Sequence, residues 1–400
     1  MAPRRPIYLD HQATTPIDPR VVEAMLPFLR EDFGNPASKS HVYGWRAEAA
    51  VENARERIAA VVGAQPREII FTSGATESNN LALIGAVGAA FASPPGGVRS
   101  HVITVETEHR AVLDPCAWLE TRGLEVTRLP VDSEGLVDPE AVRAAIHDRT
   151  RWVSVMAANN EIGVLQPIEE IGGVCREAGV WFHSDAAQAV GKIPVNVDRL
   201  QVDLLSISFH KMYGPKGIGA LYVRARNPRV RLEPLIHGGG HEQGLRSGTL
   251  PVALIAGAAT ALDLCAAELE PEAKRQRELR DHLWKRLSRD LEGVVANGHV
   301  ERRLPGCLNV SFAGVDGDAL LSDLEDVAVS SGSACTSAEP EPSYVLAALG
   351  LSPEQARASL RFGLGRDTRS EDIERAADCV VSAVRRLRGE SGAAKKSQSE

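Results

Sequence analysis

Residues 203–217 are Asp-Leu-Leu-Ser-Ile-Ser-Phe-His-Lys-Met-Tyr-Gly-Pro-Lys-Gly. The first half is a short apolar run that fits a buried strand, and the Gly/Pro-rich half predicts a turn. Lys211 would then lie at the mouth of a sheet, where its amine is placed for covalent chemistry. A lone lysine after a core strand is more often a surface residue. The functional interpretation therefore depends on the segments that accompany it.

A second apolar run begins at Val180 and ends at Asp185, in Asp-Ala-Ala-Gln. In a parallel sheet both runs end at the carboxyl edge, where open α/β sheets bind ligands. An amine that can form an imine, together with a carboxylate that can keep a pyridinium nitrogen protonated, is what pyridoxal 5'-phosphate (PLP) requires. Asp185 alone would more often be a turn or cap residue. Paired with Lys211, it indicates a PLP site.

A candidate phosphate cradle lies at residues 71–80, Phe-Thr-Ser-Gly-Ala-Thr-Glu-Ser-Asn-Asn. A strand end passes through Gly74 into a helix, and the amides at a helix N-terminus bind anions. Taken alone, this stretch is more typical of a helix with an ordinary Ser/Thr cap. Ser208 and His210 flank the Lys211 turn and add two polar groups, which favours the phosphate interpretation.

The composition is that of a large enzyme. The chain has 400 residues, 44% of them hydrophobic, which is enough for two domains. A net charge of -8 disfavours nucleic acid or an anionic membrane as the main partner. No apolar stretch approaches the roughly 20 residues that span a bilayer, and the basic start lacks the apolar core of a signal peptide. We therefore expect a cytoplasmic protein.

The cysteines and histidines give little sign of a metal. The six cysteines form no C-x-x-C pair, so neither a disulfide framework nor a zinc site is predicted. His237 and His241 are separated by three glycines, and two histidines four apart share a face only on a helix, which glycines disfavour. We expect no metal here, and favour a Gly-rich loop near the active site or at a subunit contact.

Strand and helix patterns alternate from about residue 45 to 262, which predicts a mostly parallel sheet flanked by helices. A charged stretch at 263–292 predicts one long connecting helix with a break near Pro271. Beyond it, strands are expected at 308–312, 327–330 and 359–363, and a terminal helix at 370–387.

Two polar segments follow other predicted strands. His109 comes after the strand that ends at Val105, where a histidine can move protons near neutral pH; the alternative is a hydrogen-bonded surface histidine. Asn159, Asn160 and Glu161 also follow a strand, and the alternative there is an Asx-rich turn.

Cys335 differs from the other five cysteines, which we expect to be buried small hydrophobes. Its neighbours at 330–338 are small and mostly polar, which predicts an exposed, mobile segment. An exposed thiol is normally a liability. In a chain with a PLP site it predicts a nucleophile.

Eight segments, in order along about residues 7–388, resemble those of NifS/IscS-type cysteine desulfurases. Any one of them would be a weak signal, whereas eight in order make chance agreement negligible. The segments are residues 8–16, 72–80, 107–109, 159–163, 185–188, 208–211, 246–249 and 330–337.

The resemblance implies the aspartate aminotransferase-like α/β fold, fold type I of PLP enzymes, in its class V aminotransferase branch. A large PLP-binding domain at 16–262 would surround a mostly parallel seven-stranded sheet. A smaller α+β domain would comprise 1–15 and 263–388 and carry the mobile cysteine loop at about 328–340. Residues 389–400 would be a disordered tail, and two chains would form a homodimer.

The resemblance also implies roles for individual residues at the cofactor. They are Lys211 for the imine with PLP, Asp185 for the pyridine nitrogen, Gln188 for the ring hydroxyl, His109 stacked on the ring and aiding proton transfer, Asn160 near cofactor and substrate, Ala75, Thr76, Ser208 and His210 for the phosphate, and Thr249 for the phosphate of the partner subunit.

For the substrate, L-cysteine, the resemblance implies a carboxylate clamp at Arg361 and a contact at Asn35. Cys335 would take the sulfur as a persulfide, leaving L-alanine, and pass it to an acceptor such as an IscU/NifU-like iron-sulfur scaffold protein. The polar C-terminus lacks the longer, aromatic-containing tail with which IscS-type enzymes often dock that scaffold, so the acceptor stays open.

Three functions are compatible with these residues. Cysteine desulfurase is favoured, for iron-sulfur cluster assembly or another sulfur-containing product. Selenocysteine lyase or another class V PLP enzyme is the alternative, although an aminotransferase needs no thiol like that of Cys335. A non-catalytic scaffold is disfavoured, because the full set of reactive residues is present.

Overall fold

The computed structural model describes residues 5–91, 101–227, 229–331 and 342–390. Its larger lobe is built on a seven-stranded sheet with the order β2-β8-β7-β6-β5-β3-β4. β8 runs in the opposite direction to the other six strands, which are parallel to one another, so the predicted mostly parallel α/β sheet is confirmed. The strands are β2 (Ile69–Thr72), β3 (His101–Val105), β4 (Glu125–Leu129), β5 (Thr150–Ser154), β6 (Trp181–Asp185), β7 (Leu204–Ser208) and β8 (Gly219–Val223).

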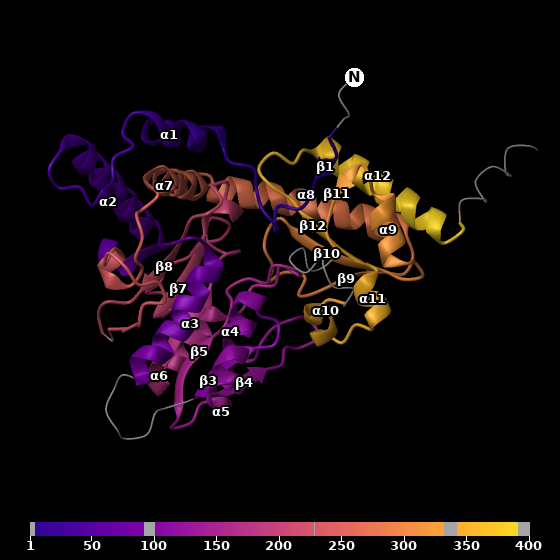
Figure 1. The fold of residues 1–400 in the computed structure, drawn as a ribbon. Helices are drawn as coiled ribbons and strands as arrows, with labels where there is room; N and C mark the ends of the chain where they lie inside the picture. Colours follow the sequence, from indigo (N-terminus) through magenta and orange to yellow (C-terminus); the bar gives the residue numbers. More distant parts are fainter. Residues whose placement is uncertain (1–4, 92–100, 228, 332–341, 391–400) are drawn as a thin grey trace, which may run out of the picture.

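Helices cover both faces of this sheet (Figure 1). The apolar sides of α2, α6 and α7 pack against one face, and α3 packs against the other, with α4 beside it. Burial on both faces explains why the central strands are continuous apolar runs. The helices of this lobe are α1 (Pro19–Arg30), α2 (Val42–Val62), α3 (Ala75–Phe91), α4 (Arg110–Glu120), α5 (Pro139–Ala145), α6 (Ile168–Ala178) and α7 (Val252–Ala267).

The two central strands β6 and β7 position the residues singled out above. They pair in parallel with Asp185 opposite Ser206, so both end at the same edge of the sheet. A single 3-10 turn, η2 (Phe209–Lys211), follows β7 directly. The fold therefore brings Asp185 and Lys211 to the carboxyl edge, as the sequence predicts.

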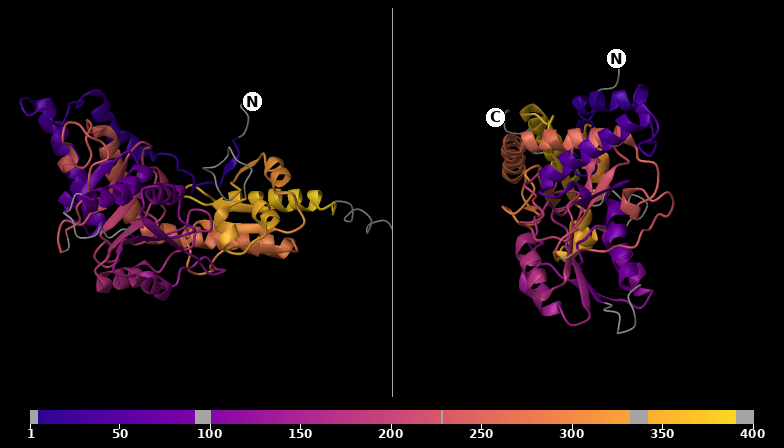
Figure 2. Two further views of the ribbon diagram at one scale, coloured as in Figure 1. Left: turned by 60° about the horizontal axis from the view of Figure 1, so that its bottom comes forward. Right: turned by 90° about the vertical axis from the view of Figure 1, so that its left-hand side faces the viewer.

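The smaller lobe has its own apolar core. An antiparallel sheet with the order β12-β10-β9 lies beside the parallel pair of β1 and β11. Figure 2 shows this orange and yellow lobe at one end of the molecule. Its elements are β1 (Ile7–Tyr8), β9 (Val294–Ala296), β10 (Cys307–Phe312), β11 (Val327–Ala328), β12 (Ser359–Gly363), α8 (Leu269–Asp290), α9 (Gly317–Asp323), α10 (Tyr344–Ala348), α11 (Pro353–Arg357) and α12 (Ser370–Leu387).

This core includes Ile7 and Leu9 from the start of the chain as well as residues from α8 and α12. The division into a large domain at 16–262 and a small domain at 1–15 and 263–388 stays a prediction. The predicted strands at 308–312 and 359–363 and the terminal helix at 370–387 are confirmed within one residue.

The predicted connecting helix at 263–292 is confirmed for 269–290, but its start and the break near Pro271 are misplaced. Two helices, α7 and α8, meet at Glu268 with a bend of 71°. Pro271 does not break the helix, because it lies in the first turn of α8, where no intrahelical hydrogen bond needs its missing N–H. Among the described residues no single helix is long and apolar enough to cross a membrane. The bent pair of α7 and α8 reaches that length and composition only when the two helices are taken together.

Candidate active site

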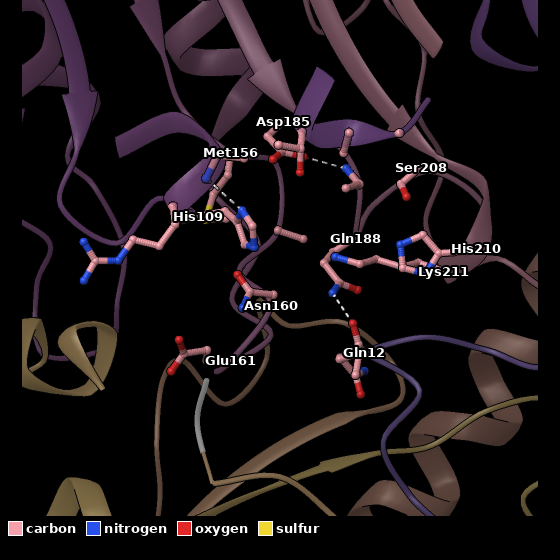
Figure 3. A pocket seen from close by; sticks show the side chains of 18 of the residues that line it. Gln12, His109, Met156, Asn160, Glu161, Asp185, Gln188, Ser208, His210 and Lys211 are labelled. Atoms are coloured by element: carbon pink, nitrogen blue, oxygen red, sulfur yellow. Dashed lines mark hydrogen bonds between the residues drawn. The ribbon is translucent and has the colours of Figure 1, made fainter. Parts of the chain in front are cut away.

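A cavity of about 400 Å³ opens at the carboxyl edge of the large sheet (Figure 3). Most of the residues predicted for the site lie in its wall, contributed by strand ends, by the start of α3 and by β12 of the smaller lobe. The predicted residues that line it are Ala75, Thr76, His109, Asn160, Asp185, Gln188, Ser208, His210, Lys211 and Arg361.

Two of the predicted site residues that the structure describes are not in this wall. Thr249 and Asn35 are exposed and do not line the cavity of their own chain, so their roles stay predictions. Cys335 lies outside the described residues. The other five cysteines are buried or partly buried, as expected of structural thiols.

Lys211 ends the η2 turn, and Thr15 from the N-terminal segment fixes this turn. The Thr15 hydroxyl donates to the His210 carbonyl oxygen at 2.8 Å and accepts from the Tyr213 amide at 2.8 Å. Tyr213 has a φ of 64°, a left-handed conformation that few non-glycine residues adopt. The reactive amine is thus held on a tightly hydrogen-bonded turn rather than on a loose loop.

The Asp185 carboxylate is held by two donors. The Asn79 side-chain amide donates to one oxygen at 2.6 Å, and the Ala187 backbone amide donates to the other at 2.9 Å. Asp185 is 5% exposed, so these bonds fix its orientation in a mostly water-free setting. A carboxylate oriented in this way can face and charge-pair a protonated ring nitrogen.

His109 combines a structural and a chemical role. Its Nδ1 accepts from the Ala111 amide at 3.0 Å and caps α4, so the neutral ring carries its proton on Nε2. Burial lowers the pKa of His109; the charge of Asp185 acts to raise it, and that of Lys211 acts to lower it further. The ring therefore faces the cavity uncharged, as stacking on an aromatic cofactor requires.

Glu108, directly before His109, is fully buried behind this wall. Its Oε1 accepts from the Met156 amide at 2.5 Å, while its Oε2 has no partner among the described residues. Burial, and then the charge of Asp185, raise the pKa of Glu108 well above its ordinary value. Glu108 is therefore a neutral carboxylic acid beside a charged one.

An anion site lies at the start of α3. The amides of Ala75 and Thr76 stand in the first turn, where helix amides have no intrahelical acceptor. His210 lines the same side of the cavity, and burial together with the charge of Lys211 lowers its pKa to about 4. At neutral pH it can donate a hydrogen bond without adding charge. This donor set suits a phosphate ester.

Arg361 approaches from β12 and is 1% exposed. One terminal nitrogen donates to Asp10 at 2.7 Å and the other to the Asn160 carbonyl oxygen at 3.0 Å. These bonds hold the planar guanidinium at the cavity wall, where its fork can bind a carboxylate.

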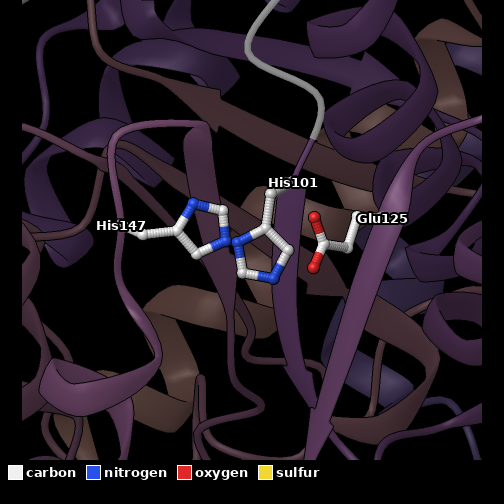
Figure 4. Close-up of side chains that lie close together, drawn as sticks. All are labelled: His101, Glu125 and His147. Carbon is white, nitrogen blue, oxygen red and sulfur yellow. The ribbon is translucent and has the colours of Figure 1, made fainter.

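The opposite edge of the sheet carries a cluster of three side chains of the types that bind metal ions. His101, Glu125 and His147 lie close together (Figure 4). However, the two histidine rings are stacked 4.3 Å apart instead of converging. Both nitrogens of His101 already bond threonine hydroxyls, those of Thr150 and Thr127, at 2.8 Å. The cluster is therefore a hydrogen-bonded group, and it supports no metal proposal.

Some residues of the site were not predicted from the sequence. The sequence predicts no role for Thr15, Asn79 or Glu108, although each lies in a segment that resembles the family. Their partners lie far along the chain, so no local pattern indicates the contacts. The Thr-Thr-Pro, Ser-Asn-Asn and Thr-Glu-His segments that contain them are the only signal that could have drawn attention to them.

The donors and charges of this cavity fit PLP. A lysine amine, a carboxylate held by two donors, an uncharged imidazole and a helix N-terminus surround one space of suitable size. A site of this kind, at the carboxyl edge of a mostly parallel sheet, defines a PLP-dependent enzyme with the aspartate aminotransferase-like fold.

Comparison with known proteins agrees. The model of the class-V aminotransferase family matches residues 7–376. The chain is 53% identical over 383 residues to the cysteine desulfurase IscS of Rickettsia bellii, which covers 96% of this chain and 92% of that protein. It is also 53% identical over 384 residues to the cysteine desulfurase of Mus musculus, covering 96% of this chain and 82% of that protein.

Solved structures show the same relationship. A NifS-like protein, 37% identical, superposes with a TM-score of 0.87 over 96% of this chain and 100% of that chain. SspA in complex with cysteine, 40% identical, gives a TM-score of 0.79 over 89% of this chain and 98% of that chain. The protein belongs to the class-V aminotransferase family, and its cofactor is PLP.

Proposed function

We propose that this protein mobilises sulfur from L-cysteine: it is a cysteine desulfurase, which yields L-alanine and leaves the sulfur on Cys335. The observation that carries this proposal is the convergence of Lys211, Asp185 and Arg361 on one cavity. The chain that contains them is 53% identical to cysteine desulfurases over 96% of its length.

Each residue of the cavity has a role that follows from its position. Bound PLP supplies an electron sink for negative charge at the substrate Cα. Asp185 would keep the ring nitrogen protonated, since the hydrogen bonds from Asn79 and Ala187 fix its carboxylate at the cavity wall. Lys211 would hold the cofactor through its side-chain amine, and this amine could accept the Cα proton of the substrate.

Arg361 selects and orients the substrate. Its fork binds the substrate carboxylate, and Asn160 beside it contacts the same end of the molecule. The Arg361 guanidinium belongs to β12 of the smaller lobe, so a bound substrate would contact residues of both lobes. The uncharged His109 ring covers the reacting centre and can pass a proton through Nε2.

Cys335 is proposed as the nucleophile on the strength of the sequence. Its thiolate attacks the substrate sulfur, and an S–S bond forms while the substrate C–S bond breaks. The electron pair of the broken bond stays on carbon, which is protonated to give L-alanine. The substrate carbon is reduced and the two sulfurs are oxidised to the persulfide level, so no external oxidant is needed. A sulfur-acceptor protein then accepts the persulfide sulfur.

The proposed assembly is a homodimer, and two features support it. Large apolar side chains are exposed on and between α1 and α2, among them Phe33 at 67% and Trp45 at 54%. Such patches on a folded chain are typical of interfaces. Asn35 lies within this same region, and Thr249 is likewise exposed outside its own cavity. We propose that Thr249 reaches the phosphate site of the partner subunit.

The sulfur acceptor is proposed to be an iron-sulfur scaffold protein of the IscU/NifU type, and the location the cytoplasm. Size-exclusion chromatography with light scattering tests the dimer. A monomeric holoenzyme that retains full PLP affinity would contradict the role of Thr249.

The experiment that tests the function compares substrates and products. Wild-type holoenzyme and the Cys335→Ala variant are each given L-cysteine or L-selenocysteine, and L-alanine is measured. We expect the wild type to form alanine from L-cysteine and the variant to lose at least about a hundredfold in rate. If the variant uses L-cysteine normally, or if only L-selenocysteine is used, the lyase alternative is correct.

A further inference from the structure

Lys192 lies behind the cofactor site and contacts one of the residues proposed to bind the cofactor. Its Nζ donates to the Gln188 side-chain oxygen at 2.6 Å. The Gln188 side-chain nitrogen donates in turn to the Gln12 carbonyl oxygen at 2.8 Å, as Figure 3 shows. The Gln188 amide is therefore held at both ends, one turn after Asp185.

These two contacts decide which way the Gln188 amide faces. A backbone carbonyl accepts only from the NH₂ group, and a lysine ammonium donates only to the oxygen. The oxygen of Gln188 is thus occupied by Lys192, and the second N–H of its nitrogen remains available to the cavity that Gln188 lines. This N–H would meet the ring hydroxyl oxygen of PLP, which an amide oxygen would repel when that hydroxyl is ionised.

The setting of Lys192 is unfavourable for a lysine that serves packing alone. It lines a second cavity of about 20 Å³, too small for a ligand larger than water. None of the ion pairs found in the described part of the chain involves Lys192. Burial, and next the charge of Lys211, lower the pKa of Lys192 to about 7. A methionine would fill this space without the cost of burying an amine.

Other charged or titratable groups also face Lys192. Cys265 and Cys307 act to raise its pKa, and Arg361 acts to lower it. His11, Tyr213 and Glu272 line the small cavity together with Lys192.

We propose that Lys192 is a positioning residue for PLP, which acts through Gln188. It turns the amide so that an N–H group meets the ring hydroxyl oxygen, and in its protonated form its charge polarises that donor. The stabilised ring oxygen then attracts the proton on the Lys211 nitrogen less strongly, so this nitrogen loses its proton at lower pH. The inference rests on the proposed contact between Gln188 and the cofactor.

The test is a spectrophotometric pH titration of the Lys211-bound cofactor without substrate. Lys192→Met is compared with the wild type and with Lys285→Met, which removes the same charge from an exposed position on α8. We expect the titration midpoint of Lys192→Met to rise by about one pH unit, and that of Lys285→Met to stay at the wild-type value. An unchanged midpoint in a folded, PLP-loaded Lys192→Met variant would overturn the inference.

A double-variant comparison tests the route through Gln188. In a Gln188→Ala background, Lys192→Met should produce little further shift, because the relay is already broken. A full additional shift would mean that Lys192 acts directly through space and would contradict the positioning role. If the wild type itself binds no PLP at Lys211, the proposed function fails first, and this result is distinguishable from an unchanged midpoint in the variant.

Discussion

Two neighbouring carboxyl groups, Asp185 at the cavity wall and the fully buried Glu108, differ in burial and in their hydrogen-bond partners. Asp185 accepts two hydrogen bonds and lies at the cavity wall. Glu108 accepts one bond from Met156, and its second oxygen meets no partner among the described residues. Two charges so close in a dry interior repel, so the less solvated group keeps its proton. This arrangement reserves the negative charge for Asp185.

Replacing Glu108 by glutamine tests its neutral state. The folded protein keeps a proton on Glu108 that the unfolded chain releases above about pH 4.3. The free energy of unfolding of the wild type should therefore fall as the pH rises from there toward the raised pKa of Glu108. Glu108→Gln should remove this decline, since an amide resembles a protonated carboxyl. Urea unfolding of the apoprotein at several pH values measures it.

The matched control is Glu106→Gln, at a partly exposed position two residues away. It should change neither the stability nor its pH dependence by more than about 0.5 kcal/mol. If Glu108→Gln is strongly destabilised at neutral pH while the control is not, Glu108 is charged in the folded protein, and the account of the two carboxyls is wrong.

Among single residues, those whose role depends on the end of a strand can be predicted from the sequence. Lys211, Asp185 and His109 are such residues, because each lies at or just beyond the end of an apolar run. Glu108, Asn79 and Lys192 are not, because their importance arises from partners in other elements. Side-chain contacts between segments a hundred residues apart leave no periodic pattern in a single sequence.

At the scale of elements, the phosphate site depends on close contact between β8 and the start of α3. A Cβ atom on Gly219 would lie 2.6 Å from Gly74 Cα and 2.8 Å from the Ile207 carbonyl oxygen. Only glycine fits there, because the nearby atoms are backbone and cannot rotate away. The amides of Ala75 and Thr76 are therefore positioned by the packing of two elements as well as by the helix itself.

Gly219→Ala should push these elements apart and weaken PLP binding. Because the anion site would shift as a whole, we expect the Kd for PLP to rise at least about tenfold. Fluorescence titration of the apoprotein measures this. Gly173→Ala is the control, since a Cβ there meets only the Gln201 side chain at 3.6 Å. Equal PLP affinities for the two variants would contradict the packing argument.

Element prediction succeeded where the residue pattern was regular. The central strands are continuous apolar runs and α12 shows a clear helical period, whereas the edge strand β4 is partly exposed and contains Glu125 and Arg128, so no apolar run indicates it. The helix break was misplaced at Pro271, since proline is tolerated in a first turn. The contact of Thr249 cannot be derived from one chain, because it is proposed to involve a second.

At the scale of the whole molecule, Arg366 joins the two lobes. It donates to Asp18, the N-cap of α1, at 2.6 Å and to Glu272 of α8 at 3.1 Å. Its guanidinium also lies 4.2 Å from the centre of the Tyr213 ring, next to the Lys211 turn. One largely buried cation thus compensates carboxylates of both lobes at the bend between α7 and α8.

Arg366→Gln should leave Glu272 without its cationic partner and remove one of the two arginines that hold Asp18, which keeps its hydrogen bonds from Arg20. We expect the free energy of unfolding to fall by about 3 kcal/mol, measured by urea denaturation of the holoenzyme. The control is Arg289→Gln, whose ion pair with Asp290 involves an arginine side chain that is 66% exposed, so little or no loss of stability is expected. Similar losses in both variants would show that Arg366 does not hold the lobes together.

The central claim is that this PLP enzyme transfers sulfur from L-cysteine to its own Cys335. The most direct measurement is the mass of the Cys335 peptide after one equivalent of L-cysteine is added to PLP-loaded protein without reductant, with L-alanine measured in the same sample. The account predicts one added sulfur atom on Cys335 for each L-alanine formed. L-alanine formed without sulfur on Cys335, or sulfur bound at another cysteine, would contradict it.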